Sequence, residues 1–85
     1  MSRIEKLWRS VTTNSQSIAY RDLEKLLRAF GFRLDRASGS HQIWVHDRVN
    51  RPFPIQPRGG EAKGYQVRQF VTLVELHGLT MEDGE

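Results

Sequence analysis

The chain has 85 residues and no cysteine, which predicts one small domain and excludes a disulfide framework or a thiolate metal site. It has no run of 18 apolar residues, and its first residues lack the apolar stretch of a signal peptide. We therefore expect a soluble, cytoplasmic protein without a membrane segment. A net charge of +3, with ten arginines among 13 basic residues, favours a nucleic acid or an acidic protein as partner.

The charges are unevenly distributed along the chain. Residues 28–68 contain eight basic and three acidic side chains, whereas three of the ten acidic residues fall in the last four positions. We expect the central part to carry a basic surface and residues 80–85 to form an acidic, disordered tail. The alternative is that the arginines are ordinary solvent-exposed residues on the surface of a small domain.

Apolar residues at helical spacing predict the first two helices. Residues 1–14 are expected to form a helical arm, joined by a polar linker to a domain over residues 18–79. Residues 20–30 have the same apolar spacing, and the glycine that follows, Gly31, is typical of a helix end. The apolar residues of the arm are Ile4, Leu7, Trp8 and Val11.

Three strands are predicted in the middle of the chain. Residues 32–36 alternate apolar with charged, residues 37–40 form a turn, and residues 40–47 form the second strand. After a polar loop over residues 47–51, residues 53–56 are expected to form a short third strand. Prolines surround this strand, and because proline cannot donate to a ladder we expect it at the edge of the sheet.

The C-terminal part predicts a glycine-rich loop over residues 58–64 and a last helix over residues 65–77, ended by Gly78. Without the arm, the order is helix, three strands, helix. Two helices on one face of a three-stranded antiparallel sheet make an α+β two-layer fold, as in double-stranded-RNA-binding domains. The arm adds an extra N-terminal helix.

His41 is the residue best placed for chemistry, because it follows Gly39 and Ser40 at the start of the second predicted strand. Imidazole can both accept and donate a proton near neutrality, so a histidine at a strand end among basic residues suits work on a phosphodiester. The alternative is a solvated polar residue without a catalytic role.

The other two histidines are less suitable. His46 lies five residues after His41, so the two should point to opposite faces of the strand, about 17 Å apart, and cannot form an acid–base pair. We expect His46 to be a solvated strand end. His77 falls in the last turn of the final helix, where a cation favours the helix dipole.

Basic residues near the same turn are candidates for RNA binding and for stabilising a charged transition state. Arg36 leads into the turn, and Arg58 and Lys63 lie in the glycine-rich loop; backbone-phosphate contact or solvation is the alternative. Ser40 could donate to a phosphate, although satisfying the turn is favoured. No histidine or carboxylate cluster has metal-ligand spacing, so we expect no metal and no other cofactor.

Two aromatic residues and a glycine pair have more than one interpretation. Trp44 could stack on an unpaired base, but core packing is favoured, and its face is undecided because both sides of its strand carry apolar residues. Tyr65 is ambiguous in the same way. Gly59 and Gly60 are expected to form a plain flexible loop rather than a phosphate nest.

Three blocks in this order resemble the HicA family of toxins from prokaryotic toxin–antitoxin modules. They are YRDLEKLLRAFGF at residues 20–32, SGSHQIWVH at 38–46 and KGYQVRQF at 63–70, and the resemblance covers about residues 18–79. It implies a double-stranded-RNA-binding-like fold, cleavage of single-stranded mRNA without the ribosome, and neutralisation by a cognate HicB-type antitoxin. The catalytic histidine of the family falls on His41.

Two departures accompany this resemblance. Minimal family members begin near Ile18, so the arm is an addition, and many members have a second histidine where this chain has Pro57 and Arg58. We hypothesise a metal-independent endoribonuclease toxin with His41 as general acid or base. The alternatives are a non-catalytic RNA-binding module and a protein-interaction domain whose arm and arginines bind an acidic partner.

Overall fold

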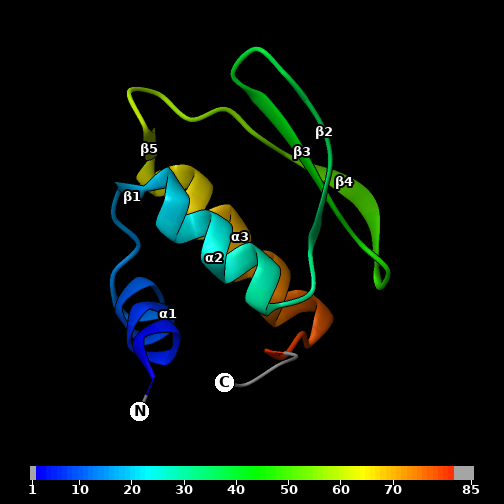
Figure 1. Cartoon of the computed structure of the whole chain (residues 1–85). Helices are drawn as coiled ribbons and strands as arrows, with labels where there is room; N and C mark the ends of the chain where they lie inside the picture. Colours follow the sequence, from blue (N-terminus) through cyan, green and yellow to red (C-terminus); the bar gives the residue numbers. More distant parts are fainter. Residues whose placement is uncertain (1, 82–85) are drawn as a thin grey trace.

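The computed structural model describes residues 2–81. A three-stranded antiparallel sheet is covered on one face by two helices, and a third helix packs beside them, which confirms the α+β, double-stranded-RNA-binding-like fold with an extra N-terminal helix (Figure 1). No helix in this part of the chain is long and apolar enough to cross a membrane. The elements are α1 (Arg3–Thr13), β1 (Ile18–Ala19), α2 (Tyr20–Ala29), β2 (Arg33–Ser38), β3 (His41–His46), β4 (Val49–Ile55), β5 (Glu61–Ala62) and α3 (Gly64–His77).

The two helices that cover the sheet end where the sequence predicts. Gly31, which follows α2, has a φ of 92°, and Gly78, at the end of α3, has a φ of 60°. L-residues with a Cβ rarely adopt this left-handed region, so glycine lets each chain turn out of its helix. The apolar stripes of both helices meet in the core, through Leu23, Leu26 and Leu27 of α2 and Val67, Phe70, Val71 and Val74 of α3.

The sheet has the order β2-β3-β4, with β3 in the centre and β4 at an edge, as expected. Two strand boundaries differ from the prediction by two residues or more. β2 continues to Ser38, so the turn is only two residues long, and β4 already begins at Val49, so the predicted loop over residues 47–51 is wrong for its second half. Prolines hide this strand from sequence patterns, but an edge strand tolerates them when the missing N–H would face away from the ladder.

A second, two-stranded sheet was not predicted. β1 pairs with β5 in antiparallel register, Ile18 opposite Ala62, and the Tyr20 N–H donates to the Gly60 carbonyl at 2.8 Å. The expected glycine-rich loop is therefore an ordered turn, in which Gly59 and Gly60 have φ angles of 58° and 77°. Positive φ at both central residues is the requirement of a tight type I′ turn.

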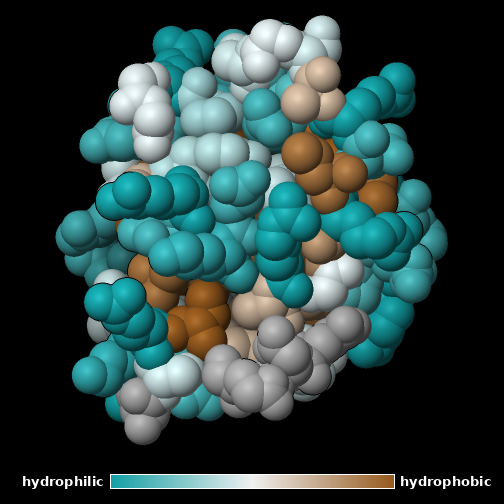
Figure 2. All heavy atoms as spheres, in the orientation of Figure 1, coloured by the Kyte–Doolittle hydropathy of each residue, from teal (hydrophilic) through white to brown (hydrophobic). Residues whose placement is uncertain are grey.

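The segment expected to be an arm packs against the core. The indole of Trp8 packs against both Phe30 and Phe70, with ring centroids 4.7 and 5.9 Å away, and Val11 is only 1% exposed. Polar side chains cover most of the face in Figure 2, and apolar atoms show in two small areas, one near α1 and α2 and one over the three-stranded sheet. Most of the expected acidic tail, residues 82–85, lies outside the described residues.

Candidate catalytic site on the open face of the sheet

The side chain of Trp44, at the centre of β3, points into the core. It is fully buried, its Nε1–H donates to the Tyr20 hydroxyl at 3.0 Å, and the Arg28 guanidinium lies 5.0 Å from its ring centroid. Burial raises the pKa of the Tyr20 hydroxyl above its ordinary value of 10.0, which keeps it protonated at neutral pH. Trp44 therefore belongs to the core, the favoured interpretation, and cannot stack on an external base.

His46 points inward with Trp44, so the prediction of a solvated strand end is wrong. The side chain is 7% exposed, and its ring packs against Phe32 with centroids 4.9 Å apart. Nδ1 accepts from the Arg48 backbone N–H at 3.0 Å, which leaves the proton on Nε2, and Nε2–H donates to the Phe30 carbonyl at 2.9 Å. His46 thus joins β3 to the end of α2 and has no nitrogen left for catalysis.

His41 occupies the opposite face of β3 and is exposed. It is the first residue of the strand and pairs directly with Ser38 of β2 across the turn. Between them, Gly39 has a φ of 59° and Ser40 has a negative φ, the combination that a two-residue type II′ hairpin uses. The hairpin extends beyond the helices at one end of the molecule, so the imidazole is open to a large substrate (Figure 1).

Arg36 shares this open face. It pairs with Ile43, two residues after His41, so Arg36 and His41 are diagonal neighbours with backbones about 7–8 Å apart. The Arg36 side chain is 77% exposed, with its Nε 3.7 Å from the Asp35 carboxylate. Because the two side chains leave the same face of adjacent strands, Arg36 and His41 can contact the same phosphate group.

Ser40 and a residue that sequence analysis missed, Gln56, complete the turn. Gln56 Nε2 donates to the Ser40 hydroxyl oxygen at 3.4 Å, which holds the segment after β4 against the hairpin. The hydroxyl accepts in this contact and can still donate its own proton to an anion. No local pattern marks Gln56, because its role depends on how β4 aligns with β3.

The two remaining candidates lie further along the chain. Arg58 begins the tight turn, pairs with Glu61 in an isolated bridge and is exposed. Lys63 precedes α3, and its ammonium is 3.9 Å from the Glu61 carboxylate. The structure therefore groups Arg36, Ser40 and His41 at the hairpin, and places both Arg58 and Lys63 beside Glu61.

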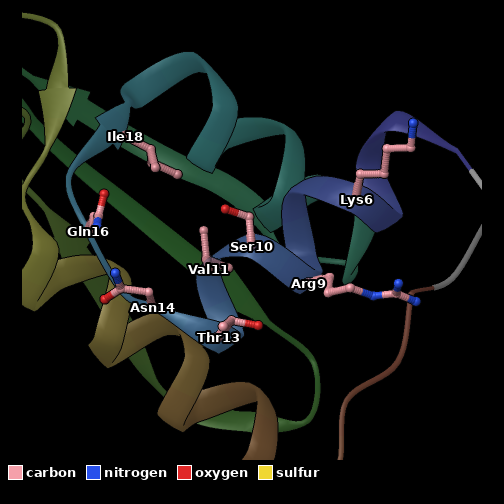
Figure 3. Close-up of a pocket in the computed structure, with 8 residues that line it drawn as sticks. All are labelled: Lys6, Arg9, Ser10, Val11, Thr13, Asn14, Gln16 and Ile18. Carbon is pink, nitrogen blue, oxygen red and sulfur yellow. The ribbon is translucent and has the colours of Figure 1, made fainter.

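A depression elsewhere on the surface lacks the chemistry for this role. It lies between α1 and the segment leading to β1, with Lys6 and Arg9 toward one end and Gln16 and Ile18 toward the other (Figure 3). The residues described along it include no histidine or carboxylate that could move a proton. Within residues 2–81, no three histidine or acidic side chains are grouped closely enough to hold a metal ion.

Comparison with known protein families fits this geometry. Residues 20–76, more than half of the chain, match the family described as HicA toxin of bacterial toxin-antitoxin. The chain belongs to the HicA toxin family. The match runs from α2 through α3 and includes the His41 hairpin, whereas α1 lies outside it. No curated protein and no solved structure matched the chain.

The two strand histidines should respond differently to mutation. We predict that His46→Ala lowers the free energy of unfolding by about 2–4 kcal/mol, because it removes two hydrogen bonds and a packed ring from the interior. His41→Ala, an exposed change at the other end of the same strand, should stay within about 0.5 kcal/mol of the wild type. Urea unfolding followed by circular dichroism measures both, and equal stabilities would contradict the buried placement of His46.

Proposed function

We propose that this HicA-family toxin is a metal-independent endoribonuclease that cleaves single-stranded mRNA in the cytoplasm, with His41 as general acid or base. One observation carries the proposal. Of the three histidines, all within the described residues, His41 alone is exposed, and it lies beside Arg36 on a protruding hairpin. A long polymer can reach this hairpin without entering a cleft.

As general base, the His41 imidazole takes the proton from a ribose 2′-hydroxyl as that oxygen attacks the adjacent phosphorus, and water protonates the 5′-oxygen as its bond to phosphorus breaks. As general acid, the imidazolium protonates the departing 5′-oxygen and water takes the 2′-proton. A flexible single strand can align the 2′-hydroxyl with the leaving oxygen, which a rigid duplex resists. General acid–base help of this kind contributes about 10²- to 10⁴-fold to a rate. A single histidine therefore fits an enzyme of modest rate.

Charge stabilisation is assigned to the side chains around the hairpin. The phosphorane-like transition state gains negative charge, and the Arg36 guanidinium lies within reach of a phosphate at His41. The Ser40 hydroxyl can donate to a second phosphate oxygen. Arg58 and Lys63 are proposed to contact neighbouring phosphates along the RNA rather than the reacting one, because they follow the hairpin at increasing distance along the chain.

A cognate HicB-type antitoxin is the proposed protein partner, since the family is defined by toxin–antitoxin modules. An inhibitor of this site has only to cover residues 38–42 and the basic side chains around them. We therefore propose that the antitoxin shields the His41 hairpin.

His41→Ala should abolish detectable RNA cleavage and the growth arrest caused by expression. Circular dichroism and RNA affinity should remain near those of the wild type, because a group that acts in the transition state contributes to rate rather than to binding. His77→Ala, a histidine at the end of α3, is the matched control and should cleave normally. Cleavage by His41→Ala at the wild-type rate would favour the non-catalytic RNA-binding module.

The basic residues make a separate prediction about binding. Affinity for single-stranded RNA should fall with salt, with a log–log slope of about −0.7 for each phosphate neutralised. Replacing Arg36, Arg58 and Lys63 together with alanine should flatten this slope. The control replaces Arg3, Lys6 and Arg9, three exposed basic residues of α1, and should leave the slope unchanged. Equal flattening by both sets would mean that only net charge matters.

A further inference from the structure

A groove runs between the edge strand β4 and the outward face of α3. It is lined by residues 49–54 of the strand and by helix residues that include Tyr65 and Leu76, which are 63% and 74% exposed. These two are the exposed large hydrophobic side chains among the described residues. They lie eleven residues apart on α3, so they share one face of the helix about 16 Å from each other. Val49, Pro52, Pro54 and Leu73 also line the groove, and exposed apolar surface of this kind is typical of a docking site.

The edge strand determines what shape of partner the groove can take. Phe53 and Ile55 pair with Trp44 and Gln42 of β3, whereas Pro52 and Pro54 alternate with them and have no N–H to offer at the free edge. An incoming strand would find carbonyl groups but few donors, so the edge resists β-augmentation. A helix needs no backbone partner, and it can bury apolar side chains between Tyr65 and Leu76.

The charge of the groove determines the chemistry of that helix. Arg51 and Arg68 lie along it, and none of the described lining residues is acidic. Acidic side chains on an amphipathic helix would pair with these arginines at the rim while its apolar face fills the middle. RNA fits less well, because single strands bind through stacking on exposed aromatic rings. Tyr65 is such a ring, whereas Phe53, which also lines the groove, is only 6% exposed.

The groove also leads to the candidate catalytic hairpin. Strand β4 lines the groove as far as Pro54. Two residues later, Gln56 is hydrogen-bonded to Ser40 in the hairpin. We propose that this groove docks an acidic amphipathic helix of the antitoxin, which anchors the inhibitor next to His41. The shielding of His41 rests on the proposed function, whereas the docking itself does not.

The test measures the affinity of the purified cognate antitoxin for toxin variants, by calorimetry, in a His41→Ala background that avoids toxicity. Leu76→Ser removes an exposed apolar anchor and Arg68→Glu reverses a rim charge, and each should weaken binding at least about tenfold. Arg9→Glu, the same charge change on the exposed face of α1, is the control and should stay within about twofold of the parent. Circular dichroism checks that all variants fold.

RNA cleavage by the same groove variants, with His41 present, separates the outcomes. The proposal expects rates and RNA affinity within about twofold of the wild type, because the groove lies on the helix side of β4. Wild-type antitoxin affinity in both groove variants would overturn it, and so would a parallel loss of RNA binding, which would make the groove a nucleic-acid surface. A toxin that cleaves no RNA would refute the enzymatic function while leaving the docking comparison valid.

Discussion

The inward orientation of Trp44 determines which face of the sheet each of the remaining residues of β3 occupies. Its ring is fully buried and its N–H is bonded to Tyr20, so a shift of β3 by one residue would expose the indole and break this hydrogen bond. Because side chains alternate along a strand, His46 must then point inward and His41 outward. The core thus fixes the position of the candidate catalytic group without touching it.

Local signals predicted most of the fold. The two long helices follow apolar spacing and end at glycines, and a histidine after a Gly-Ser turn was correctly expected at the start of a strand. What failed depends on contacts between distant segments. Burial of His46 is tolerated because a carbonyl 16 residues earlier accepts a hydrogen bond from its Nε2–H. Trp44 could not be assigned a face because apolar residues lie on both sides of β3. β1 and β5 have two residues each, too few for any pattern.

The proposed chemistry and the proposed inhibition use neighbouring but different surfaces. Cleavage needs an exposed imidazole and positive charge on the open face of the sheet, and a hairpin that extends beyond the helices supplies both. Binding of the antitoxin is strengthened by a groove with apolar lining and arginines at its rim, on the other side of the edge strand. An acidic helix can bury apolar side chains there, and RNA has no such side chains. A toxin arranged in this way can bind its inhibitor tightly without placing apolar residues at the site that must bind RNA. The separation also lets each surface be mutated independently.

The central claim is that His41 moves a proton as the RNA's own 2′-hydroxyl attacks the scissile phosphate, either from that hydroxyl or to the departing 5′-oxygen. The most direct measurement is end-group analysis of single-stranded RNA cut by the wild-type toxin in the presence of a chelator, beside a substrate with one 2′-deoxy group at the cut. The account predicts 2′,3′-cyclic phosphate ends and resistance of the deoxy substrate, because attack by the neighbouring hydroxyl needs no water and no metal. Loss of cleavage in chelator with recovery on adding magnesium, or equal cleavage of the deoxy substrate, would contradict it.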